Sequence, residues 1–249
     1  MLSAMADTMQ SQLSPLIQQH DLATVVLAAM QDQCEDVRRA AFALCGDLAR
    51  FSWPLLQPSV QPMLSLMLSH LDPYYVAVCA NAAWAIGEVA MKAGAGIEPA
   101  AGEILSRLLP ILNEPRYKRE LLENAAIALG RVCAQCPAAM APHMGSFLEP
   151  LCCALRNIDK DHSEKADAFV GLIAVLNANP EAAVPKLGYI CEAMASWRPQ
   201  NLRRRAELLL AAKTLLHSFK SALGPSWDAQ LLPSLHPKLA ETIVGLFFT

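Results

Sequence analysis

Charged residues are scarce in this sequence. They make up 17% of its 249 residues, and 20 basic against 23 acidic side chains leave a net charge of −3. Proteins that bind nucleic acid normally carry a basic excess, so this balance gives no indication of a direct nucleic-acid partner. The one dense basic cluster, Arg203-Arg204-Arg205, is expected on the solvated face of a helix.

The sequence also lacks the signals that direct a chain into a membrane or out of the cell. Its first ten residues, MLSAMADTMQ, show no basic region followed by a long apolar run, which argues against a secretory signal. No window of eighteen residues is free of charged and strongly polar side chains, so we expect no membrane partner. The eight cysteines lie in apolar periodic segments, as free thiols do in the reducing cytoplasm or nucleus.

Motifs for catalysis are missing as well. There is no glycine-rich loop that would cradle a phosphate, and none of the six histidines accompanies a nucleophile in a recognisable motif. Cys133, Cys136 and His143 begin a ligand-like spacing, but a zinc site needs a fourth ligand and usually a loop, whereas Cys133 is expected on a core helix. We therefore predict no enzyme, no metal and no cofactor.

What the sequence does contain is a repeat. Four segments align on Gly46, Gly87, Gly130 and Gly171, which are 41, 43 and 41 residues apart: DVRRAAFALCGDLA, AVCANAAWAIGEVA, ELLENAAIALGRVC and DHSEKADAFVGLIA. A fifth segment, LRRRAELLLAAKTL, fits with Ala212 in the glycine place. Helix pairs at this period are typical of HEAT and armadillo arrays. The small residues should let helices of neighbouring repeats approach closely.

The repeat predicts an all-α solenoid, or superhelix, of about six HEAT repeats, each made of a helix A and a helix B. We expect one domain over residues 1–249, with units at about 9–50, 55–93, 97–135, 138–178 and 181–219 and a C-terminal cap at 221–247. Because the first amphipathic helix begins abruptly and without a polar cap, we expect the chain to be the C-terminal part of a longer solenoid or a truncated gene product.

The second helices of such arrays conventionally line the concave surface that binds partners. Positions at fixed offsets from the aligned glycine then form a row across successive B helices. The candidate contacts on this surface are Asp47, Asn81, Trp84, Glu88, Glu123, Asn124 and Ile127. The helix around Trp84 already has an apolar stripe without it, so Trp84 is expected to be exposed beside Ile127.

The chemistry of these candidates indicates an extended ligand. Asp47, Glu88 and Glu123 favour a basic segment, and Trp84 and Ile127 favour apolar or aromatic side chains. Asn81 and Asn124 are expected to bind the ligand's backbone, because an amide both donates and accepts hydrogen bonds. A disordered peptide would fit such a surface.

The strings NAAWAIGE, LLENAAIALGR and LEPLCCALRNIDKDHSEKADAFVGL resemble the karyopherin-β2 family of nuclear import receptors, the transportins. The strings DVRRAAFALCGDL and CEAMASW resemble it more weakly, and the resemblance extends from about residue 20 to the end of the chain. It implies the C-terminal arch of a receptor that shuttles between cytoplasm and nucleus. In that family the arch binds the basic proline–tyrosine nuclear localisation signals of cargo proteins.

The resemblance also implies roles for individual residues. Trp84 matches the family's tryptophan that contacts the hydrophobic motif of the cargo, and Ile127 and Asp47 match two further family positions. Of the family's paired asparagines only Asn81 is kept, since Ala80 replaces the other, and Val76 stands in place of an isoleucine. Nucleoporins are further partners that the family allows.

Other family features lie outside this sequence. The repeats that bind the Ran GTPase, the acidic loop that couples GTPase binding to cargo release, and the site for the Pro-Tyr motif all lie upstream in the family. The resemblance therefore implies Ran binding only through N-terminal repeats that are missing here, and a cargo site that is only partly present.

Two alternatives stay open from the sequence. The chain would also suit a HEAT-repeat scaffold or adaptor that binds folded proteins on its edges, and such a protein would have no affinity for Pro-Tyr signals. A helical enzyme would need a closed pocket with converging polar groups, whereas a solenoid offers a groove.

Overall fold

The structure, a computed structural model, describes residues 21–158, 163–197 and 202–248, and it describes the side chains of these residues except those of 202–205. Within these ranges all regular structure is helical and no strand occurs. The predicted all-α solenoid of helix pairs is confirmed. The start of the predicted first helix, at residue 9, lies outside the described residues, as do Asp161 and the side chains of Arg203, Arg204 and Arg205.

The long helices alternate between two layers. The first helices of the pairs are α3 (Leu22–Ala29), α5 (Val60–Ser69), α7 (Glu98–Leu112), α10 (Met144–Arg156) and α13 (Leu187–Ser196). The second are α4 (Glu35–Leu56), α6 (Val76–Ala93), α8 (Arg119–Gln135), α11 (Ser163–Ala178) and α14 (Leu202–Leu223). We call the second set the B helices. Short α9 (Pro137–Met140) and α12 (Pro180–Ala183) precede α10 and α13, and α15 (Leu232–Ser234) and α16 (Pro237–Phe247) follow α14.

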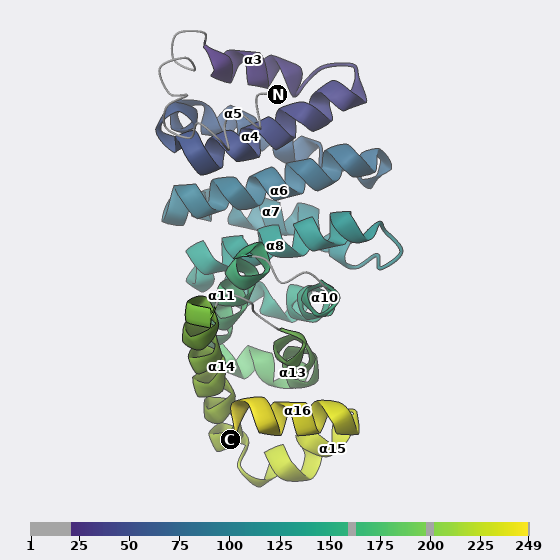
Figure 1. Cartoon of the computed structure of the whole chain (residues 1–249), viewed down its shortest axis with the longest axis vertical. Helices are drawn as coiled ribbons and strands as arrows, with labels where there is room; N and C mark the ends of the chain where they lie inside the picture. The colour runs from purple at the N-terminus through teal and green to yellow at the C-terminus, as the bar shows by residue number, and fades with distance from the viewer. Residues whose placement is uncertain (1–20, 159–162, 198–201, 249) are drawn as a thin grey trace.

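The pairs are stacked along the long axis of the molecule, from α3 at one end to α15 and α16 at the other (Figure 1). The B helices α4, α6, α8 and α11 pack against one another in succession. In Figure 1 α4 and α6 lie across the long axis, whereas α14 runs nearly along it. The B-helix layer therefore turns as it proceeds, as the helices of a superhelix do.

The aligned glycines lie where neighbouring B helices touch. A Cβ at Gly87 would lie 3.2 Å from the Cα of Ala128 in α8, and one at Gly130 would lie 2.6 Å from the Cα of Ala168 in α11. A Cβ at Gly171 would overlap the backbone oxygen of Gly130. A Cβ would therefore be tight at Gly87 and would clash at Gly130 and Gly171, so the glycines allow the close approach that the repeat pattern predicted.

The interior is a continuous apolar core. Cys45, Cys79, Cys133 and Cys191 are buried within it as free thiols. By length and composition the stretch Pro73–Leu112 is apolar enough to cross a membrane, but it is divided between α6 and α7 and most of its most apolar window is buried. The apolar side chains of this stretch pack between neighbouring repeats, as expected for the core helices of a solenoid.

Candidate ligand-binding surface

Trp84 lies partly buried in the middle of α6, between two other B helices. Its six-membered ring covers Gly46 of α4, so closely that a Cβ at that position would overlap the ring carbon Cζ3. On its other edge the indole Nε1–H donates a hydrogen bond of 2.8 Å to Oε1 of Glu164 in α11. The predicted exposure of Trp84 is therefore only partly correct, because the ring is held against the surface at both edges.

Asn81 and Asn124 occupy the same repeat position and make the same contact. The side-chain amide of Asn81 donates to the carbonyl of Arg39 in α4, and that of Asn124 donates to the carbonyl of Ala80 in α6, each over 3.0 Å. In the next repeat this position is Lys165, whose ammonium donates to the carbonyl of Ile158. Each amide group thus joins successive B helices through one N–H, which leaves the second N–H and the carbonyl oxygen of each side chain for the predicted contact with a ligand's backbone.

Glu88 belongs to a buried charge cluster. Its Oε1 accepts a hydrogen bond of 2.7 Å from Nη1 of Arg131, and Nη2 of Arg131 donates 3.0 Å to Oδ2 of Asp167. Oε1 of Glu164 lies 3.7 Å from Nη2 of the same arginine. We call Glu88, Arg131, Glu164 and Asp167 the Arg131 cluster. It joins α6, α8 and α11, and Glu88, 3% exposed, is not the counter-charge for a ligand that was predicted.

The environment of Glu88 alters its acidity. Burial raises the pKa of its carboxyl, and the neighbouring charge of Glu164 adds to this, although Arg131 and Arg50 act in the opposite direction. The physical reason is that one guanidinium serves three carboxylates, so it cannot compensate fully for the loss of water around any of them.

Ile127 is buried, with 2% of its surface exposed, which contradicts the predicted exposed pair with Trp84. It lies on α8, between α6 and α11. Both neighbouring helices pack against α8, and Ile127 is among its buried residues. Ile127 belongs to the core.

Three other predicted residues remain at the surface. Asp47 and Val76 are partly buried, on α4 and at the start of α6. Glu123 is also partly buried and accepts a hydrogen bond of 2.6 Å from Nε of Arg119, one turn earlier on α8. Together with Trp84, these side chains offer an aromatic ring and carboxylates on the surface of α4, α6 and α8.

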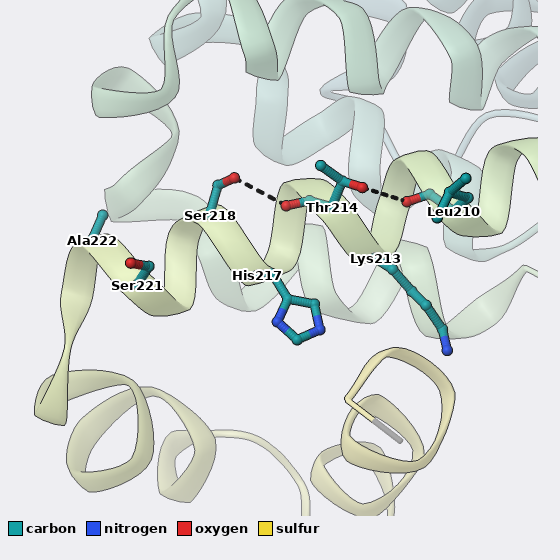
Figure 2. A pocket seen from close by; sticks show the side chains of 7 residues that line it. All are labelled: Leu210, Lys213, Thr214, His217, Ser218, Ser221 and Ala222. Atoms are coloured by element: carbon teal, nitrogen blue, oxygen red, sulfur yellow. Dashed lines mark hydrogen bonds between the residues drawn. The ribbon is translucent and has the colours of Figure 1, made fainter.

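A second feature of the B-helix layer is an open hollow along α14, lined by Leu210, Lys213, Thr214, His217, Ser218, Ser221 and Ala222 (Figure 2). The hydroxyls of Thr214 and Ser218 donate to the carbonyls of Leu210 and Thr214, each over 3.0 Å. The ring of His217 lies 3.1 Å from the carbonyl oxygen of Phe247. Most of the polar groups here are engaged within the protein, so the hollow offers little chemistry for a ligand.

The cysteine pair considered for zinc is structural. Cys133 is fully buried, and the thiol of Cys136 donates to the carbonyl of Val132. Burial raises the pKa of Cys136 to about 11, which disfavours the thiolate that a metal needs. Among the residues that the structure describes, no group of three or more His, Cys, Asp or Glu side chains is placed to hold a metal ion.

The sequence did not reveal Glu164, Asp167 and Gly46 as residues that hold Trp84 and Glu88 in place. Glu164 lies 80 residues from Trp84 and at a different repeat position, so no row of equivalent offsets contains both. A signal for the Arg131 cluster was present, since Glu88 and Arg131 hold the same offset from their glycines and have opposite charge. Opposite charges at one offset in adjacent repeats are placed to pair.

Comparison with known proteins gives a consistent result. The chain is 38% identical to a protein named Transportin-1 from Oryza sativa subsp. japonica over 98% of its length, and 33% identical to human Transportin-1 over 90%. It spans 27% and 24% of the lengths of these relatives. No family model matches the chain.

Among solved structures, the chain resembles the crystal structure of Kap121p bound to Nup53p. The TM-score is 0.58 at 15% sequence identity, and the match covers 92% of this chain and 21% of the other. At that identity the likeness concerns the fold alone.

Proposed function

Because this chain is homologous to the transportins over about a quarter of their length, we propose that it serves nuclear protein import by binding cargo localisation signals. The ligand is an extended, basic segment of the proline–tyrosine type, held without covalent chemistry on the surface of α4, α6 and α8. The protein shuttles between cytoplasm and nucleus in this role. We propose nucleoporins as further partners, and we assign no contact with Ran to this surface.

The observation that carries the proposal is the placement of Trp84. It is a large aromatic ring that remains partly accessible on a B helix, and it lies in the string NAAWAIGE, which resembles the cargo-binding family motif. Partly exposed tryptophans surrounded by polar groups are frequent anchors in protein interfaces. Asp47, Val76 and Glu123 are the remaining contacts that we propose, with Asn81 and Asn124 through their carbonyl oxygens.

The test is direct binding. The 249-residue chain is titrated by calorimetry with a synthetic basic proline–tyrosine signal peptide, and with a peptide of the same composition in scrambled order. We expect binding of the first peptide only. Equal binding of both peptides, or of neither, would contradict the proposal and favour a scaffold for folded partners.

Replacing the anchor gives the sharper measurement. We expect Trp84→Ala to weaken binding of the signal peptide by about 1–3 kcal/mol, since the ring provides a large contact area. Tyr74→Ala is the matched control, because Tyr74 is 82% exposed but lies before α6 rather than on it. If W84A folds and binds as tightly as the unaltered chain, the anchor role is refuted.

A further inference from the structure

The ring of Trp84 is fixed from two helices at once. Gly46 of α4 receives the edge of the six-membered ring, and a Cβ there would lie 2.6 Å from Cε3 and 2.9 Å from Cη2. Glu164 of α11 accepts the hydrogen bond from the opposite, nitrogen-bearing edge, over 2.8 Å. The side chain thus spans from the first described repeat to the fourth, and neither χ angle can change without loss of one contact.

Glu164 is itself held in place. Its Oε1 lies 3.7 Å from Nη2 of Arg131, and the guanidinium is fixed by Glu88 and Asp167 at 2.7 and 3.0 Å. Only 22% of the Glu164 side chain is exposed, so rotation away from this position is restricted. The acceptor for the indole is therefore a partly exposed carboxylate held at the edge of the Arg131 cluster.

We propose that Glu164 is a positioning residue for ligand binding, which through its hydrogen bond to Nε1 of Trp84 fixes the orientation in which the ring meets the ligand. A tryptophan without this bond could adopt other rotamers, and binding would then require ordering of the ring. With the bond, the ring is ordered before the ligand arrives. This inference rests on the proposed function, because it concerns the same binding surface.

The test compares three variants of the full chain for affinity toward the signal peptide used above. Glu164→Ala removes the acceptor, and we expect binding about three- to tenfold weaker, the range for ordering one side chain. Glu164→Gln keeps a side-chain oxygen that can accept the bond, and we expect affinity within about twofold of the unaltered chain. Gly46→Ala displaces the ring from the other edge without any change of charge, and we expect a loss similar to that of E164A.

The control variant is Glu192→Ala. It also removes a partly exposed glutamate that pairs with an arginine, Arg156, but it lies on α13 in the other layer. We expect E192A to bind the peptide as the unaltered chain does. A general dependence of affinity on net charge would instead weaken E192A as much as E164A.

A second readout follows the indole directly, independent of any ligand. The chain has four tryptophans, so the Nε1–H resonance of Trp84 is assigned in a ¹⁵N spectrum by its loss in Trp84→Phe. We expect this resonance to shift and its proton to exchange faster with solvent in E164A, but not in E164Q or E192A. An unchanged resonance in a folded E164A would overturn the inference.

The binding results for W84A and E164A distinguish a failure of the positioning role from a failure of the proposed function. If W84A weakens binding and E164A does not, the function stands and the positioning role is wrong. If E164Q binds the peptide as weakly as E164A although its Trp84 resonance is unchanged, the positioning role is also refuted. The negative charge of Glu164 would then act on the ligand itself. If the unaltered chain does not bind the peptide, both proposals are refuted.

Discussion

Residues at one repeat position have different environments in this molecule. Trp84 and Ile127 share an offset from their glycines, yet Trp84 is partly accessible and Ile127 is core. The two side chains therefore differ in burial although their positions in the repeat are equivalent. A fully buried residue such as Ile127 supports the surface but does not form it.

The first prediction concerns Ile127. We expect Ile127→Val to lower the free energy of unfolding by about 0.5–1.5 kcal/mol, the usual cost of removing one buried methylene. Peptide affinity should stay unchanged, because Ile127 is 2% exposed. Denaturant titration and calorimetry on the same sample measure both quantities, and a loss of affinity without a loss of stability would place Ile127 at the ligand.

The second prediction concerns pH. The raised pKa of Glu88 means that the folded state binds a proton at pH values where the unfolded state has released it. The contribution of Glu88 to the free energy of unfolding therefore falls as pH rises from the ordinary glutamate value through the raised one, and is constant above it.

Glu88→Gln keeps an acceptor for Arg131 but does not titrate. We expect E88Q to remove this part of the pH dependence, measured as the difference between the two stability curves. Glu120→Gln, an exposed glutamate on α8, is the control and should leave the curve unchanged. Parallel curves for E88Q and the unaltered chain would show that Glu88 keeps an ordinary acidity.

Helices in the B layer are spaced by their glycines. Gly130 and Gly171 meet so closely that the backbone of one helix lies against the other, and this contact recurs at the interval of the repeat. The spacing in turn brings Asn124 within reach of the Ala80 carbonyl, and Arg131 within reach of Glu88. Small residues thus determine which polar side chains can bridge two repeats.

The third prediction tests this spacing. We expect Gly171→Ala to destabilise the chain by about 1–3 kcal/mol, because its Cβ would overlap the backbone of Gly130 and force α8 and α11 apart. Gly102→Ala is the matched control on α7, where a Cβ meets nothing within 4 Å. There we expect a gain of about 0.5–1 kcal/mol, since alanine favours a helix interior. Thermal unfolding of the two variants and of the unaltered chain measures both changes in stability, and an equal stability of G171A and G102A would contradict the prediction.

The period of the glycines was sufficient to predict helix pairs and a solenoid, because close packing of successive helices requires small residues at a regular interval in the sequence. It could not predict which row positions stay open. That depends on the turn of the superhelix, which brings Glu164 onto Trp84 from two helices away. Likewise the pattern placed Glu88 on a polar stripe, but its burial follows from Arg131 and Asp167 on other helices.

Across the whole molecule, ion pairs link successive repeats in addition to the continuous apolar core. The ion-pair partners of Arg131 are Glu88 on α6 and Asp167 on α11. Arrays of repeats normally depend on contacts between neighbours alone. Arg131 makes two such neighbour contacts at once, so the cluster couples three successive B helices.

The fourth prediction addresses that coupling. We expect Arg131→Met to lower the free energy of unfolding by about 3–5 kcal/mol, because it leaves buried carboxylates without their cation. Hydrogen exchange should become faster in α6, α8 and α11 together rather than in α8 alone. Arg116→Met serves as the control, since Arg116 pairs with Glu114 at an exposed turn, where ion pairs contribute little. Faster exchange confined to α8 would show that the repeats are independent.

The bond between Trp84 and Glu164 has a mechanical consequence. It joins α6 to α11 past α8, so its length depends on the bend accumulated over two repeat interfaces. When the molecule is pulled straight, the displacements at both interfaces add at this one bond, whereas a contact between adjacent helices experiences only one of them. We therefore expect the hydrogen bond from Trp84 to Glu164 to lengthen before the contacts between adjacent helices do when the solenoid is extended.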